Sequence, residues 1–374
     1  MRKVGIMSMQ RIANYGSFLQ AYALKQLIEE VGCNVEFVDY HVGAPVITEN
    51  ADSKNKVVRK IEKGLETFRY RAPLAHKLSF IRYKQSFAQK YMPLLGITDE
   101  MNYNPTVDCL VIGSDEVFNC IQKNSNVGYS PELFGKNNHA KKLITYAASF
   151  GNTTLVKLEK YKKTDEVGAL LKKFDAISVR DANSGAIVEQ LTGKEPLYNL
   201  DPVLTYDYMN CCDKIPQVQT NEKYLILYAY AGRISNEEAD WISDYAKKKK
   251  LKVYAIGGIQ KCADRFVDCS PFEVLAYFRN AEEVITDTFH GSIFSVITHR
   301  PFTTLIRKSV GNSYGNEEKL SDLLKRLKLA DRMTTKIEDA ENINEKTIDY
   351  AKVDELLKAH REVAKEYLRK NLEG

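Results

Sequence analysis

The chain has 374 residues, which is longer than most single domains, so its length predicts two domains. Hydrophobic residues make up 44% of the chain and charged residues 28%, and the net charge is +5; this mild charge does not indicate a nucleic-acid partner. No stretch approaches the roughly 20 apolar residues of a membrane-spanning helix. The apolar run after Met1 is too short for a signal peptide, so we expect a cytoplasmic protein.

The chain alternates short apolar strands with helices in two series. In the first series, strands are predicted at 3–8, 35–38, 108–112, 143–148, 176–179 and 197–200, and helices at 14–31 and 156–173. The segment 207–221 is polar and has no period, which indicates a linker. The second series has strands at 224–230, 252–256, from 284, and at 301–306, and helices at 236–249, 271–279, 318–328 and 353–372.

Repeated strand–helix units with strands apolar enough for burial on both faces predict parallel sheets covered by helices on both sides. We therefore expect an α/β protein with two Rossmann-like, doubly wound domains facing each other across a cleft. The expected order is an N-terminal domain over 1–206 with a basic helical insertion at 54–91, a linker at 207–221, a C-terminal domain over 222–332, and an extension with a helix at 333–374. We expect this extension to pack back on the N-terminal domain.

The insertion is strongly basic. Eleven lysines and arginines lie between Lys54 and Lys90, opposed only by Glu62 and Glu66, and apolar residues recur among them as on amphipathic helices. One interpretation is a pair of solvated helices packed on the domain. Another is a basic surface over 54–90 for anionic lipid or a diphosphate-linked substrate. A nucleic-acid face is the weakest interpretation, because no binding motif accompanies the charge.

The segment from Val284 to Phe294 carries the most chemical information. Apolar β-forming residues lead into a polar turn and then an apolar segment, which predicts a strand, a turn and a helix. Asp287, Thr288, His290 and Ser292 gather at this junction. A helix N-terminus there offers backbone N–H groups to an anion, and a histidine beside it can move a proton.

Polar residues follow other predicted strands as well. They are Asn14, Tyr15, Ser114, Asp115, Ser149, Arg180, Arg307 and Lys308. Because parallel strands point their carboxyl ends the same way, these residues are expected to converge on one rim of each domain. Simpler roles stay open: Asn14 and Asp115 suit helix caps, and Arg180 with Asp181 suits a structural ion pair.

Motifs for metals and common cofactors are absent from the sequence. There is no H-x-x-x-H, H-E-x-x-H or D-x-D cluster, no G-x-G-x-x-G after the first strand, and no P-loop. The seven cysteines are scattered and form no C-x-x-C pair, which favours free thiols over a metal or redox site. We expect no metal and no bound cofactor.

Six motifs occur in a characteristic order. They are Ile6–Ser8 with Asn14–Leu24, Val111–Asn119, Tyr146–Gly151, Ile177–Asp181, Leu200–Pro202 and Ile285–Ser292. Together, from about Lys3 to Arg332, they resemble the polysaccharide pyruvyl transferase family. The resemblance implies a fold like that of the GT-B glycosyltransferases. It also implies transfer of the enolpyruvyl carbons of phosphoenolpyruvate, a co-substrate, onto two sugar hydroxyls, which forms a cyclic ketal.

The resemblance also suggests roles for individual residues. His290 matches the motif histidine and is expected as general acid or base, with Asp115 as a second catalytic candidate. Phosphoenolpyruvate carries two anionic groups, which guanidinium groups and helix N-termini bind well. The expected donor-binding residues are Arg180, Arg307, Lys308, Ser292 and Gly291. The expected residues of the acceptor side or the cleft lining are Asn14, Tyr15, Ser114, Ser149, Asp287 and Thr288.

Two alternatives and one conditional expectation remain. The first alternative is a nucleotide-sugar glycosyltransferase of the GT-B type. The second is a non-catalytic sugar- or anion-binding relative, favoured by Thr288, because some family members have an arginine at this position. If the saccharide acceptor is carried on a lipid diphosphate, the segment 54–90 would hold the enzyme at the inner face of the membrane.

Overall fold

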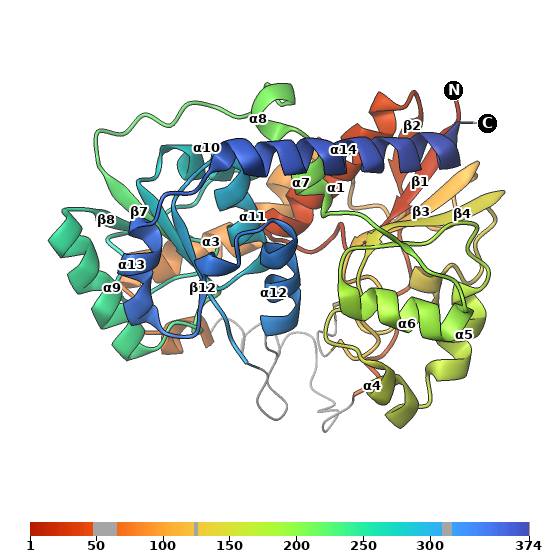
Figure 1. The fold of residues 1–374 in the computed structure, drawn as a ribbon, viewed down its shortest axis with the longest axis horizontal. Coiled ribbons are helices and arrows are strands. Elements are labelled where there is room, and N and C mark those ends of the chain that lie inside the picture. Colours follow the sequence, from red (N-terminus) through yellow and green to blue (C-terminus); the bar gives the residue numbers. More distant parts are fainter. Residues whose placement is uncertain (48–65, 123–125, 309–315, 374) are drawn as a thin grey trace.

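The computed structural model describes residues 1–47, 66–122, 126–308 and 316–373, and it contains two six-stranded parallel sheets (Figure 1). The first sheet has the order β2-β1-β3-β4-β5-β6. Its strands are β1 (Lys3–Met7), β2 (Asn34–Phe37), β3 (Cys109–Asp115), β4 (Lys142–Ala148), β5 (Ser178–Val179) and β6 (Leu197–Tyr198). The central strands β3 and β4 are buried almost throughout, as expected for strands covered by helices on both faces.

The helices of the first domain are α1 (Tyr15–Glu30), α3 (Leu74–Tyr91), α4 (Leu155–Lys160), α5 (Thr164–Leu171), α6 (Ala182–Thr192) and α7 (Pro202–Thr205). The prediction of a single helix over 156–173 is wrong, because the structure has two helices there, α4 and α5. The chain between them includes Lys162, which has a φ of 55° and therefore cannot continue a right-handed helix. Helix α6 begins where the Asp181 side chain accepts a hydrogen bond from the Ser184 N–H.

The second sheet has the order β12-β11-β10-β7-β8-β9. Its strands are β7 (Tyr224–Tyr228), β8 (Lys252–Ile256), β9 (Arg265–Phe266), β10 (Glu283–Thr286), β11 (Phe302–Leu305) and β12 (Met333–Thr334). Its helices are α9 (Asn236–Lys249), α10 (Pro271–Asn280), α11 (Phe289–Ile297), α12 (Glu317–Arg326) and α13 (Ala340–Glu345). The expected α/β fold with two Rossmann-like domains is confirmed. The second sheet continues to β12, two residues beyond the expected boundary at 332.

The segment 207–221 between the sheets contains a short helix, α8 (Tyr208–Cys211). The Tyr208 side chain is buried, and its hydroxyl donates a hydrogen bond to the Leu19 carbonyl of α1. The beginning of this expected linker is therefore anchored to the first domain, and it is less independent than its polar sequence suggests.

The two domains share apolar packing. Phe18 and Tyr22 of α1 contact Phe272 of α10, with ring centroids 5.8 Å and 5.0 Å apart. Helix α3 adds a second contact, because its buried Phe80 packs edge-on against Phe266 of β9. Burial of aromatic rings is a large stabilising contribution, so the interdomain boundary here resembles a protein core.

Helix α14 (Tyr350–Leu372) crosses both domains and brings the C-terminus beside the N-terminus (Figure 1). At its start, the Tyr350 hydroxyl donates to the Arg300 carbonyl in the second domain. Near its end, the Tyr367 hydroxyl donates to the Thr145 carbonyl of β4 in the first domain. Arg2 also donates to the Leu372 carbonyl. The extension thus contacts the N-terminal domain through the second half of α14.

Only part of the basic insertion 54–91 falls within the described residues, since 48–65 lie outside them. Helix α3 buries Phe80, Tyr83 and Phe87, which pack toward Tyr15 and Phe266, so this apolar face is already covered by protein. Leu74 and Leu78 remain 62% and 51% exposed. In the described part of the chain, no helix is long and apolar enough to cross a membrane.

Candidate active site

The candidate site lies where the strand order of each sheet reverses. In the first sheet the order turns between β1 and β3, and in the second between β7 and β10. Open parallel sheets bind ligands at the carboxyl ends of strands beside such a reversal. Asp115 ends β3, and His290 follows β10 by four residues. The two domains therefore each contribute one candidate catalytic residue from the expected position.

Arg180 holds two carboxylates of the first domain. Its Nη2 lies 2.9 Å from Asp115 Oδ1 and its Nη1 lies 3.1 Å from Asp201 Oδ2. The guanidinium also stacks 4.6 Å above the Phe289 ring of the second domain. Burial disfavours the charge on Arg180, but Asp115 and Asp201 raise the pKa of this arginine above its ordinary value. Both Nη atoms are thus occupied by carboxylates, which argues against the expected role of Arg180 as a donor-anion clamp.

His290 is held between the two domains. It is the second residue of α11, whose N-cap is Thr288, and its side chain is 14% exposed. Nε2 lies 3.6 Å from Asp201 Oδ2, which is longer than a hydrogen bond. On its other side the ring lies against α1, because a Cβ built on Gly16 would be 2.3 Å from His290 Nδ1. The imidazole ring can therefore occupy this position only because Gly16 has no side chain.

Asp201 is fully buried and supports both groups. It is the N-cap of α7, and its Oδ1 accepts a hydrogen bond from the Val203 N–H. Burial opposes its ionisation, but His290 and Arg180 together hold the pKa of Asp201 below its ordinary value. Asp201 therefore lies as a carboxylate between the arginine and the histidine, with its ionised form favoured by both.

A second group of charges surrounds Asp287, the residue directly before the N-cap of α11. We call it the Asp287 cluster, and its members are Asp287, Arg233, Arg307 and Glu238. Arg307 forms a double ion pair with Glu238, at 2.6 Å and 3.1 Å. Asp287 is fully buried and lies 3.9 Å from Arg233 Nη1 and 4.0 Å from Arg307 Nε. Burial raises the pKa of Asp287 to about 6, although Arg233 and Arg307 oppose this effect. Asp287 is therefore not a cleft-lining residue, contrary to expectation.

Tyr230 and Lys319 connect the two groups of charges. Tyr230 follows β7, and 46% of its surface is exposed. Desolvation of the phenol raises the pKa of Tyr230. The positive charges of Lys319 and Arg233 oppose this shift, and the negative charges of Asp115 and Asp287 add to it. Lys319 of α12 also forms a 3.0 Å ion pair with Glu116 of the first domain. Charged groups of both domains thus face the same region.

Several expected side chains are engaged elsewhere. The Tyr15 hydroxyl donates to the Cys269 carbonyl, and its ring is buried against Tyr83 and Phe87, so this residue joins the domains and does not line the site. Ser114 is fully buried, with its hydroxyl donating to the Ala147 carbonyl. Ser149 donates to Asp181 and is also buried. These two serines support strand ends and have no free hydroxyl for an acceptor.

The residues at the start of α11 divide by role. The Thr288 side chain accepts a hydrogen bond from the Gly291 N–H and so caps the helix. Ser292 is fully buried and bonds within its own domain to Thr288 and Thr304. The structure thus places Ser292 and the Gly291 N–H in the support of α11 and not in donor contact.

Asn14 caps α1 by accepting a hydrogen bond from the Ser17 N–H, which is the simpler role considered from sequence. Lys308 is exposed.

Four residues of the site were missed by the sequence interpretation: Asp201, Gly16, Arg233 and Lys319. Asp201 had a signal, since an aspartate followed by proline after a predicted strand is typical of a helix start at a strand end. Gly16 follows Asn14 and Tyr15, which the sequence did indicate, but only the tertiary structure reveals the His290 ring that occupies its side-chain space. Within the described ranges, no group of three or more His, Cys, Asp or Glu side chains could hold a metal ion.

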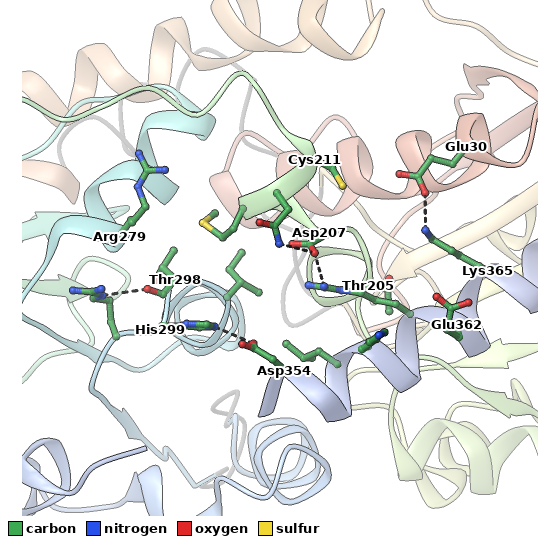
Figure 2. A pocket seen from close by; sticks show the side chains of 17 residues that line it. Glu30, Thr205, Asp207, Cys211, Arg279, Thr298, His299, Asp354, Glu362 and Lys365 are labelled. Atoms are coloured by element: carbon green, nitrogen blue, oxygen red, sulfur yellow. Dashed lines mark hydrogen bonds and ion pairs between the residues drawn. The ribbon is translucent and has the colours of Figure 1, made fainter. Parts of the chain in front are cut away.

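A separate pocket of about 690 Å³ lies between α14 and both domains (Figure 2). Two ion pairs are formed among the residues of its wall, Arg361 with Asp207 at 2.7 Å and Lys365 with Glu30 at 3.2 Å, and His299 forms a 2.9 Å hydrogen bond with Asp354. Its charged wall is thus largely paired internally. None of the residues expected to be functional lines it. The pocket is therefore distinct from the His290 site.

The site thus brings a histidine, an arginine and two aspartates together at the sheet edges of two facing Rossmann-like domains. The chain belongs to the polysaccharide pyruvyl transferase family, whose model matches residues 14–309. This match includes Asp115, Arg180, Asp201 and His290. No curated protein is significantly similar in sequence.

Several solved structures are similar over most of their length. The UDP-GlcNAc 2-epimerase of Methanocaldococcus jannaschii has a TM-score of 0.49 at 10% identity, covering 93% of each chain. MnaA of S. aureus, solved with UDP, has a TM-score of 0.47 at 11% identity, covering 96% of this chain and 90% of that one. The spinosyn rhamnosyltransferase SpnG has a TM-score of 0.40 at 9% identity, covering 100% and 96%. At these scores and identities, the likenesses say nothing about function.

Proposed function

We propose that this protein transfers the enolpyruvyl carbons of phosphoenolpyruvate onto two hydroxyls of a sugar in a cell-surface polysaccharide or its precursor. The product is a cyclic pyruvate ketal, and phosphate is released. The observation that carries the proposal is the meeting of His290, from the second domain, with Asp201 and the Arg180–Asp115 pair of the first domain. Family membership supplies the reaction class.

The reaction requires two proton movements. The two sugar hydroxyls lose one proton each as their oxygens bond to C2 of the donor. One proton is gained by C3, which becomes a methyl group, and the other leaves on phosphate as the C2–O bond to phosphate breaks. A group that exchanges protons near neutral pH can serve these steps.

His290 is suited to carry one of these protons. The Asp201 carboxylate lies 3.6 Å from its Nε2, on the side opposite α1, and an imidazole beside a carboxylate is a common arrangement for proton transfer. Asp115 is the second candidate. Arg180 fixes one of its oxygens, and the side chain is 15% exposed, so it can accept a proton or a hydrogen bond from a sugar hydroxyl. In this proposal Arg180 positions Asp115 and Asp201 and does not bind the donor.

The donor anions require other cations. The first turn of α11 presents the backbone N–H groups of Phe289 and His290, which Thr288 does not cap, and four cations come from nearby segments of the same domain: Arg233, Arg307, Lys308 and Lys319. Thr288 stands where some family members have an arginine, and it caps α11 instead. Arg233 can supply the missing positive charge, because it lies 3.9 Å from Asp287, the residue directly before Thr288.

In our proposal, electrostatic attraction alone brings the enzyme to a membrane that carries a lipid-linked acceptor. The apolar face of α3 is packed on protein, while Arg71, Lys77 and Arg82 of the insertion remain on the described surface. We propose that these residues attract anionic lipid or a lipid diphosphate. Replacing all three with glutamine should reduce binding to anionic vesicles at low salt, and unchanged binding would refute this role.

A donor panel tests the proposed function. Phosphoenolpyruvate should raise the melting temperature of the protein by mass action, whereas UDP- and GDP-sugars should not. His290→Gln should keep most of the shift if His290 handles protons and does not anchor the donor. A shift with a nucleotide-sugar and none with phosphoenolpyruvate would instead support a glycosyltransferase.

A further inference from the structure

Asp287 lacks the partners that a buried carboxylate normally has. The side chain is fully buried, and among the described residues neither Oδ1 nor Oδ2 has a hydrogen-bond partner of good geometry, although the Tyr230 backbone N–H comes near enough to favour its ionised form. Its two nearest cations, Arg233 and Arg307, lie at 3.9 Å and 4.0 Å, beyond hydrogen-bonding distance. Buried charges are usually both paired and hydrogen-bonded, so this carboxylate requires an explanation.

The charges around Asp287 balance only while it is ionised. Arg233 and Tyr230 face it from the loop after β7, Glu238 from α9 and Arg307 from the end of β11, and His290 lies on the helix that follows it. Two guanidinium groups and two carboxylates make the Asp287 cluster neutral. Protonation of Asp287 would leave one positive charge in excess.

Arg233 and Arg307 have donors left for a ligand. Arg233 is 32% exposed and forms no hydrogen bond to a carboxylate in the described structure. Arg307 is 25% exposed and gives Glu238 one N–H from each Nη, so in the described structure the second N–H of each Nη is left for a ligand, while its buried Nε faces Asp287 at 4.0 Å. The two arginines thus flank a buried anion without satisfying it. An oxyanion with several acceptor atoms could bind both.

We propose that Arg233 and Arg307 form a subsite for a tetrahedral oxyanion, and that Asp287 is its counter-ion and takes up one proton when the oxyanion binds. The identification of the natural oxyanion as the phosphate group of the donor rests on the proposed function, but the coupling to a proton does not. Asp287 is a positioning residue here, because it is buried and acts through the arginines.

This coupling has a chemical consequence for the proposed reaction. The phosphate group enters the site as part of the donor and leaves as free phosphate. A proton bound at Asp287 would keep Arg233 and Arg307 available to the phosphate group during the whole reaction. When phosphate departs, Asp287 ionises again and the cluster returns to neutrality. The transfer itself needs no proton from Asp287, so the balance of the reaction is unchanged.

Calorimetry with sulfate tests the proposal. Sulfate keeps its charge between about pH 5.5 and about pH 8, so any pH dependence belongs to the protein. At about pH 8, titrations in two buffers of different ionisation enthalpy should show uptake of about one proton per sulfate, and the affinity should fall by up to about tenfold per pH unit above about pH 6. Asp287→Asn should remove both effects and bind sulfate more tightly at high pH.

His290→Gln is the matched control, because it removes the imidazole carried by the helix that follows Asp287. Proton uptake should persist in this variant. Three results of the proton measurement would overturn the proposal: no uptake in wild type, uptake retained in Asp287→Asn, or uptake lost in His290→Gln. Absence of sulfate binding to wild type at both about pH 6 and about pH 8 would overturn it as well. Since sulfate replaces the donor, failure of the phosphoenolpyruvate reaction would leave these outcomes unaffected.

Discussion

Nε2 of His290 in the second domain lies 3.6 Å from Oδ2 of Asp201 in the first. Arg180 holds the same Asp201 oxygen, and it also holds Asp115. The relative position of the domains therefore sets the geometry of the site. Shared aromatic packing between α1 and α10 fixes that position.

Asp201→Asn should reduce turnover by about a hundredfold, within the range usual for general acid–base groups. The amide keeps the shape of the carboxylate but removes the negative charge that lies 3.6 Å from His290 Nε2. His290→Gln should reduce turnover at least as much. Phosphate release from phosphoenolpyruvate in the presence of acceptor measures both, and the double variant should be no worse than the more damaging single one. Additive losses would mean that the two residues act independently.

Gly16→Ala should impair activity while the fold persists. A methyl group there would lie 2.3 Å from His290 Nδ1, so the imidazole must move. Gly168→Ala is the matched control, because it is also a helical glycine and its nearest neighbours would be at 3.7 Å. Alanine at position 168 should be neutral or stabilise by about 0.5–1 kcal/mol. Normal turnover in Gly16→Ala would show that the ring position does not matter.

Arg180→Met should destabilise the protein by about 3–5 kcal/mol, because Asp115 and Asp201 would lose their buried partner. Chemical denaturation measures this loss. Lys261→Met removes an exposed ion pair with Asp240 and serves as the control, with a change of less than about 1 kcal/mol. If Asp201→Asn is added to Arg180→Met, part of the stability should return. A small loss in Arg180→Met would mean that the carboxylates are solvated in solution.

Asp287→Asn should stabilise the protein increasingly as the pH rises. Because burial raises the pKa of Asp287 to about 6, the folded wild type binds its proton more tightly than the unfolded chain does. Wild-type stability from this group is therefore full below about pH 4 and lost as the pH rises to about 6. The advantage of the asparagine variant should grow by up to about 3 kcal/mol over this window. Asp244→Asn on the surface of α9 should show no such trend in urea unfolding.

Much of the fold could be predicted because its strands and helices carry clear periodicity. The bounds of β8 and α9 agree with the sequence prediction at both ends. The edge strands β9 and β12 have two residues each, which is too short for any period to show. The break at Lys162 was also hidden, since a left-handed φ in a lysine-rich stretch has no compositional signal.

The site could be predicted only in part. Strand ends indicated Asp115 and His290, because the chain direction of a parallel sheet alone brings such residues to one edge. The two ion pairs of Arg180 could not be predicted, since its partners Asp115 and Asp201 lie 65 and 21 residues away in the sequence. Ser292 was misjudged for a related reason: the side that a helical residue turns to its own domain depends on packing against β11.

The proposed transfer can be followed by NMR with phosphoenolpyruvate labelled with ¹³C at C2, during incubation with a panel of saccharides. We predict that the label moves into a ketal carbon of a saccharide with release of one phosphate per ketal, and that His290→Gln abolishes this signal. Unchanged phosphoenolpyruvate across the panel, together with consumption of a nucleotide-sugar on the same acceptors, would contradict the account.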